Sequence, residues 1–297
     1  KLLRLLILNR QNYIFALNRP SFHSRGPTFT NFATSFRSVA PDFSSVTTNV
    51  HYQTTGNMVV LIPIDRTMFF VPLPVVLRAL IEIEDIQIYK AIVGNSNSSF
   101  VSDRVIATLR YASEMGLLTR AAAREYLGAH FRNAFKPPKH LSNEECCEIL
   151  LQRYLFPHLS GEAPSKKFDL LILMTRMLIQ LVKGDILPDN MDANSAHEIL
   201  TPGTLWLPVI SDSILGILKD AANKIYKDLH NGNPVGKDLN EVMNNCHQYF
   251  AGDSVTKRIR QLFATGSING PTLGFSQTEG LSIIAERINF CRYLSHF

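Results

Sequence analysis

The sequence changes from strand-like to helix-like patterning at Pro72 and Pro74, and this change limits the chain to the α+β class. Short apolar and aromatic runs separated by turn residues fill the stretch from Leu2 to about Ile64, as expected for β-strands. After the two prolines, apolar residues recur at helical spacing in successive segments. We therefore expect a mixed β-sheet region, then a largely helical region, then a second helical region that leads into the C-terminal segment.

The strand-like part contains one aromatic series and two turn signals. Phe29, Phe32 and Phe36 alternate with threonines, and no dense basic interleaving accompanies them, so they predict sheet packing rather than a platform for stacking bases. Gly56-Asn57 predicts a hairpin, although the order is not the favoured Asn-Gly. Asp65-Arg66 predicts a further turn.

The helical part can be divided by its caps and by its periodicity. Thr119 is a suitable N-cap, and Ser142 with Glu145 has the pattern of a capping box. The predicted helices run from Val75 through about Ile92, around Val105 to Met115, after Thr119, after Ser142, over Phe168 to Val182, from Ile210 to Leu229 after Pro208, and around Leu239 to Tyr249. The Gly-, Pro-, Asn- and Asp-rich stretch 185–202 predicts the main domain boundary.

The last forty residues combine a basic helix with a glycine-bearing loop and a second periodic run. Val255, Ile259, Leu262 and Phe263 form one apolar stripe at helical spacing. The loop between Gly266 and Gly280 predicts a flexible, turn-rich excursion. The second run places four apolar residues on one helical face, namely Ile284, Ile288, Cys291 and Leu294.

Five cations in this stretch are the candidate nucleic-acid-binding residues. Lys257 and Arg260 fall opposite the apolar stripe, and Arg258 falls on its shoulder; Arg287 and Arg292 flank the second run. A basic rim on a buried scaffold is suited to a phosphate backbone. The alternative for the first three is a solvated helix face. The alternative for Arg287 and Arg292 is pairing with Glu279 or Glu286.

The composition and the motifs exclude several other kinds of site. A net charge of +5 over 297 residues is a weak field, which permits a polyanionic partner without requiring one. Four cysteines without a CxxC pair argue against a zinc ribbon. The acidic residues Asp185, Asp189, Asp192 and Glu198 lack calcium-loop spacing and predict a solvated loop. The opening KLLRLLIL is too short for a membrane span, and no catalytic constellation is evident.

Several segments resemble the second-largest subunit of multisubunit DNA-dependent RNA polymerases. These segments are LNRPSFHSRG, the His51-Tyr52 pair, LILMTRMLIQLVKGD, FATGS and GLSIIAERINFCRYLSHF. The INFCRYLSHF ending looks most like RNA polymerase I. The resemblance implies that residues 1–12 end the first protrusion segment, 13–188 form the lobe, 189–256 form the second protrusion segment and 257–297 begin the fork.

The resemblance also implies a function and partners. The chain would form part of the DNA cleft wall of RNA polymerase I during rRNA gene transcription, in the nucleolus of the nucleus, without catalytic residues of its own. No cofactor is expected in this segment, because the Mg²⁺ and Zn²⁺ of such enzymes are bound elsewhere. The expected partners are the largest subunit and other subunits, a transcription factor IIF-like heterodimer and a zinc-ribbon subunit at the lobe, the DNA template and the RNA–DNA hybrid, with no membrane. The alternatives are the same region of polymerase II or III, or a stand-alone helical interaction module.

Overall fold

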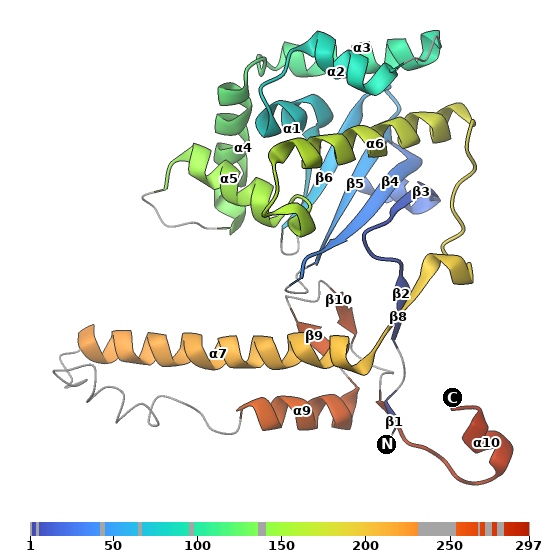
Figure 1. Ribbon diagram of the computed structural model, residues 1–297, viewed down its shortest axis with the longest axis vertical. Helices are drawn as coiled ribbons and strands as arrows, with labels where there is room; N and C mark the ends of the chain where they lie inside the picture. Colours follow the sequence, from blue (N-terminus) through green and yellow to red (C-terminus); the bar gives the residue numbers. More distant parts are fainter. Residues whose placement is uncertain are drawn as a thin grey trace. The chain divides into compact units, whose positions relative to one another are not determined.

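A computed structural model describes residues 2–3, 6–41, 45–64, 67–94, 98–135, 141–230, 254–266, 268–270, 275–277 and 282–296 (Figure 1). The chain divides into two compact units. One unit consists of Asn9–Pro41 and Ser45–Ala196, and the other contains Lys1–Leu8 and His197–Phe297. No helix within the described ranges is long and apolar enough to cross a membrane.

The first unit begins with a five-stranded antiparallel sheet whose strands follow one another in sequence order. The strands are β3 (Ile14–Asn18), β4 (Phe29–Val39), β5 (Ser45–Gln53), β6 (Met58–Ile64) and β7 (Thr67–Pro72), and the 3₁₀ turn η1 (Pro20–Arg25) lies between the first two. The predicted hairpin is confirmed, because β5 pairs with β6 across a turn in which Gly56 has a φ of 87°. The predicted turn at Asp65-Arg66 lies outside the described residues.

Helices cover one face of this sheet, so the α+β prediction is confirmed (Figure 1). They are α1 (Leu73–Leu80), α2 (Asp85–Val93), α3 (Ser99–Glu114), α4 (Arg120–Phe135), α5 (Asn143–Arg153) and α6 (Pro164–Lys183), with the 3₁₀ turn η2 (Pro157–Leu159) before α6. Both predicted caps are present. The Ala122 N–H donates to Thr119 Oγ1 at 3.2 Å, and Ser142 and Glu145 bond reciprocally at the start of α5.

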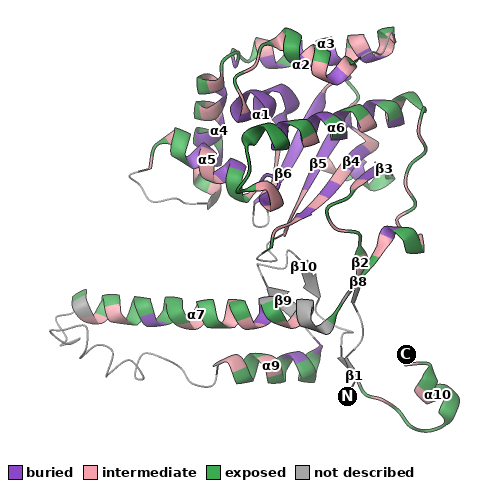
Figure 2. Cartoon of the chain, in the orientation of Figure 1, coloured by how far each residue is buried: buried purple, intermediate pink, exposed green. Residues whose placement is uncertain are grey.

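The alternation of side chains along the strands divides the apolar residues between two cores. The main core lies on the helix side of the sheet, and it includes every apolar residue of α1 except Pro74 (Figure 2). A smaller core on the other side contains Phe15, Leu17, Phe22, Ala33 and Ala196. Among the predicted aromatic residues, Phe29 and Phe36 are buried and Phe32 is half-buried, as expected for sheet packing.

Four basic side chains donate hydrogen bonds to carbonyl groups at or just beyond helix C-termini, where carbonyl groups lack helical partners. The pairs are Arg124 with Ala79 of α1, Arg176 with Ala91 of α2, Arg78 with Leu117 after α3, and Lys167 with Leu151 of α5 and Leu155 beyond it. Burial lowers the pKa of Lys167 to about 8, against the opposing charge of Glu148. These four cations therefore stabilise helix ends within this unit.

Gly128 allows α4 and α5 to pack closely, because a Cβ atom at this position would overlap the Asn143 carbonyl oxygen. We expect Gly128→Ala to lower the free energy of unfolding by about 2 kcal/mol, despite the higher helix propensity of alanine. The matched control is Gly216→Ala in a helix with open space around that position, which should be neutral or stabilising. Thermal unfolding by circular dichroism, with amide exchange to separate the two units, measures both variants; equal effects would contradict the packing argument.

Within the described ranges, the second unit contains short strands, two longer helices and one short helix. These are β1 (Leu2–Leu3) paired with β11 (Ser282–Ile283), β2 (Leu6–Asn9) paired with β8 (His197–Leu200), β9 (Ile268–Gly270) paired with β10 (Phe275–Gln277), and the helices α7 (Pro202–His230), α9 (Ser254–Thr265) and α10 (Phe290–Leu294). The turn η3 (Asn194–Ala196) precedes β8. The predicted helix around Leu239 to Tyr249 lies outside the described residues.

The structure corrects several predicted boundaries. The helix expected from Val75 through Ile92 is two helices, because Ile81 adopts an extended conformation and Glu84 caps α2. The helix expected at Val105 begins at Ser99, and the helix expected at Ile210 begins at Pro202, which places Pro208 inside it. Pro208, which was expected to precede the second of these helices, is therefore not its start signal.

Two predictions about the C-terminal segment are wrong in part. The loop after Gly266 contains the paired strands β9 and β10 rather than turns alone. The single helical face expected from Ile284 to Leu294 is absent from the described residues, because only Phe290–Leu294 is helical there. Ile284 and Ile288 are 70% and 80% exposed, so apolar spacing without packing did not produce a helix.

Candidate nucleic-acid interface

The helix α9 carries three of the five candidate cations and has one packed side. Leu262 is 2% exposed, Val255 and Ile259 are half-buried, and the Phe263 ring lies 5.2 Å from the Trp206 ring of α7. The helix ends at Gly266, whose N–H donates to the Leu262 carbonyl at 2.8 Å and whose φ is 69°. The apolar stripe expected from the sequence is therefore the packed side of this helix, although Phe263 remains 41% exposed.

The three cations of α9 are exposed, with Lys257 and Arg260 opposite the packed side and Arg258 on its shoulder. Among the described residues, no ion pair involves Lys257 or Arg260. Lys257 and Arg260 are three residues apart, so they lie on neighbouring positions of the helix surface. The geometry gives a pair of accessible positive charges on a helix that packs against its own unit.

The two cations near the C-terminus are placed differently. Arg292 Nε donates to a Glu286 carboxylate oxygen at 2.8 Å, so one of the two predicted internal pairings is present. This hydrogen bond, together with the charge of Arg292, lowers the pKa of Glu286. Arg287 is exposed, and its guanidinium lies 5.3 Å from the centre of the Tyr293 ring. Glu279 lies outside the described residues.

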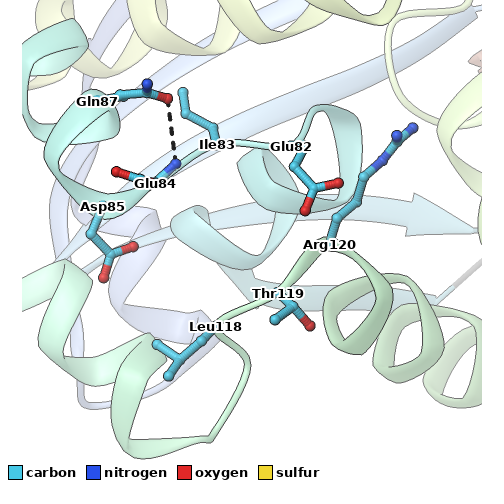
Figure 3. A pocket seen from close by; sticks show the side chains of 8 residues that line it. All are labelled: Glu82, Ile83, Glu84, Asp85, Gln87, Leu118, Thr119 and Arg120. Atoms are coloured by element: carbon cyan, nitrogen blue, oxygen red, sulfur yellow. Dashed lines mark hydrogen bonds between the residues drawn. The ribbon is translucent and has the colours of Figure 1, made fainter.

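An open pocket of about 600 Å³ lies between the α1–α2 and α3–α4 connections (Figure 3). Its lining residues are Glu82, Ile83, Glu84, Asp85, Gln87, Leu118, Thr119 and Arg120. Two of its carboxylates already have structural roles, because Glu84 caps α2 and Asp85 pairs with Arg78. The acidic lining is unsuited to a nucleic-acid backbone.

Cys147 and Asp189 have structural surroundings in the first unit. Burial raises the pKa of Cys147 to about 12, so its thiol stays protonated near neutral pH. Within the described part of the chain, no group of three or more His, Cys, Asp or Glu side chains could hold a metal ion. In the acidic stretch expected to be solvated, Asp185, Asp192 and Glu198 are exposed as predicted, whereas Asp189 is half-buried and bonds to strand β3.

Comparisons with known proteins give a consistent result. Residues 10–199 match the family described as RNA polymerase Rpb2, domain 2. The DNA-directed RNA polymerase I subunits RPA2 of Pongo abelii and Homo sapiens are each 34% identical over 299 residues, which cover 100% of this chain and 26% of each relative. The subunit RPA135 of Saccharomyces cerevisiae is 30% identical over 301 residues, with 100% and 25% covered. The chain thus spans about a quarter of the length of the curated relatives that it matches.

Proposed function

The chain belongs to the RNA polymerase Rpb2 family, of which it contains domain 2, and it is homologous along its length to the second-largest subunit of RNA polymerase I; from this premise we propose that it forms part of the DNA cleft wall of that enzyme. The whole enzyme would synthesise rRNA on a DNA template in the nucleolus. The relatives named above are polymerase I subunits, which favours this assignment over polymerase II or III and over a stand-alone module.

The proposal gives each segment a place in the subunit. Residues 13–188 form the lobe, and this range is close to the first compact unit, Asn9–Pro41 with Ser45–Ala196. Residues 1–12 and 189–256 belong to the protrusion, and 257–297 begin the fork. The partners are the largest and other polymerase subunits, with a IIF-like heterodimer and a zinc-ribbon subunit at the lobe. The proposal assigns the Mg²⁺ and Zn²⁺ of the whole enzyme to other segments of the polymerase.

The observation that carries the nucleic-acid role is the exposure of Lys257 and Arg260 on the outer side of α9. Arg258 extends this basic surface. Arg287 is also exposed and is proposed as a weaker contact, whereas the charge of Arg292 is already engaged by Glu286. These cations position a polyanion and read no sequence, because phosphate contacts supply affinity without specificity. The chain's contribution to the reaction is therefore positional.

Replacing both cations tests this role. In the assembled polymerase, Lys257→Glu with Arg260→Glu should weaken template binding about tenfold at low salt and reduce the dependence of affinity on salt, because fewer counterions are released. Fluorescence anisotropy of a labelled DNA–RNA scaffold at several salt concentrations measures both effects. Subunit composition should stay normal.

A matched control separates position from net charge. Lys219→Glu with Lys227→Glu changes the net charge by the same amount, at exposed positions of α7. This control should retain most of the affinity. An equal loss in both double variants would mean that the effect is one of overall charge, and normal template binding by the α9 variant would remove the role assigned to Lys257 and Arg260.

A further inference from the structure

The two edge strands of the five-stranded sheet, β3 and β7, differ in whether their outward hydrogen-bonding groups are already paired. At the β3 edge, the Ala16 N–H donates to the Asp189 carboxylate at 2.7 Å, and the Asp189 N–H donates to the Ala16 carbonyl at 2.8 Å. The segment before β8 thus occupies the outward N–H and C=O groups of Ala16, at the middle of that edge strand. Such protection is the usual way in which proteins keep edge strands from pairing with other chains.

The β7 edge has no such cover among the described residues. Strand β7 is the last strand of the sheet, and within the described ranges its residues from Thr67 to Phe70 make no backbone hydrogen bonds outside the ladder. Met68 is 55% exposed, and Phe69 and Phe70 are half-buried. The start of the strand is therefore accessible, whereas its end at Val71 and Pro72 is buried.

The pairing register identifies which backbone groups are available. Ile64 is paired with Thr67 across a two-residue connection, so this closing pair exchanges hydrogen bonds, and the next pair, Pro63 with Met68, does not. Proline has no N–H to donate, which agrees with this phase. The N–H and C=O groups of Met68 and Phe70 consequently point away from β6, at the spacing that a further strand would require.

Side chains near the β7 edge, on both faces of the sheet, are placed where an added strand could contact them. On the helix side, the Phe69 ring lies 5.7 Å from the ring of His130, which is exposed and stacks on Tyr126 at 5.8 Å. On the other side lie the exposed Met68 and the half-buried Phe70. A strand with alternating apolar side chains would find contacts on each face.

We propose that the β7 edge at Met68 and Phe70 is a β-augmentation site that receives an extended segment of a different protein chain. The edge is too short for a second copy of this chain, because two residues bury far less than the roughly 1,000 Å² that a stable dimer needs. A segment held at high local concentration by contacts elsewhere on the same assembly does not have this limitation. This choice of occupant rests on the proposed function, in which the chain is one subunit of several.

Amide exchange in the assembled polymerase tests the proposal directly. The Met68 and Phe70 amides should exchange as slowly as those of Thr67 and Phe69, which bond to β6, although the exposed edge alone would leave them at least tenfold faster. Rapid exchange at Met68 and Phe70 in the assembled enzyme would overturn the proposal. Failure of the subunit to assemble with other polymerase subunits would instead contradict the proposed function.

Substitution with proline gives a second, independent measurement. A photoreactive amino acid in place of His130 should cross-link to another subunit or bound factor. Met68→Pro should reduce that cross-link about fivefold, because it removes the outward N–H, whereas Met68→Val keeps the N–H and should not. Unchanged exchange in α4 shows that each variant is folded. Equal cross-linking in both variants, no cross-link, or a cross-link to a second copy of this chain would each overturn the proposal.

Discussion

Lowering the pH from 6.5 toward 3 is expected to remove roughly 5 kcal/mol of folding free energy through His51. His51 is fully buried on β5, with the rings of Phe22 and Phe29 at 4.9 Å and 5.7 Å. Burial, and then the neighbouring charge of Arg25, lowers the pKa of His51 to about 3. The native imidazole is therefore neutral, and its Nε2 atom accepts from the Arg25 guanidinium.

The direction of the effect follows from where the proton binds. Below pH 6.5 the unfolded chain protonates His51, whereas the native chain does not until about pH 3. Stability from this group is thus fully present above pH 6.5 and falls as the pH decreases through this window. Protonation in the fold would place two cations in contact and remove the acceptor for Arg25.

The variant His51→Gln isolates this contribution, because glutamine keeps an acceptor and cannot titrate. Its free energy of unfolding should change much less between pH 6.5 and 4 than that of the wild-type chain. Urea unfolding should be followed by far-UV circular dichroism, because the only tryptophan, Trp206, lies in α7 of the other unit. His158→Gln is the control, because burial also lowers the pKa of that half-buried histidine. This variant should retain the part of the pH dependence that His51 causes. Parallel pH profiles for His51→Gln and the wild type would contradict the assignment.

Local signals in the sequence predicted local structure well. The caps at Thr119 and Ser142, the hairpin at Gly56 and the α9 stripe each depend on residues a few positions apart, and each is present. The error at the end of α1 has a cause outside that helix. Helix α1 ends where Arg78 reaches both Asp85 and the Leu117 carbonyl, and no periodicity over Val75 to Ile92 contains that information.

The candidate site was predictable to a similar extent. Exposure of Lys257 and Arg260 follows from helical spacing against the apolar stripe. The commitment of Arg292 to Glu286 was one of two pairings left open by the sequence. The positions of Lys and Arg in the sequence could not distinguish these cations from Arg124, Arg176 and Lys167. Each of these three donates a hydrogen bond to a carbonyl group near the end of a helix elsewhere in the chain.

Removing the carboxylate of Asp85 should destabilise the first unit by about 3–5 kcal/mol, which is more than removing its buried partner Arg78. Arg78 is 1% exposed and bonds to Asp85 and to the Leu117 carbonyl, while the Asp85 side chain is 42% exposed. Asp85→Ala leaves a buried guanidinium without its counter-charge. Arg78→Met removes the buried charge, fills similar volume and leaves a carboxylate that water can reach, so its expected cost is about 1–2 kcal/mol.

A double-mutant cycle distinguishes this argument from a simple loss of contacts. The combination Arg78→Met with Asp85→Ala should be about as stable as Arg78→Met alone, because the unpaired guanidinium is gone. The exposed pair of Lys183 and Asp185, with both side chains at least 40% exposed, provides the control; Asp185→Ala should cost less than about 0.5 kcal/mol. Urea unfolding by far-UV circular dichroism measures all four variants. The double variant could instead lose as much free energy of unfolding as the two single variants together. In that case the destabilisation would come from independent contacts rather than from an unpaired buried charge.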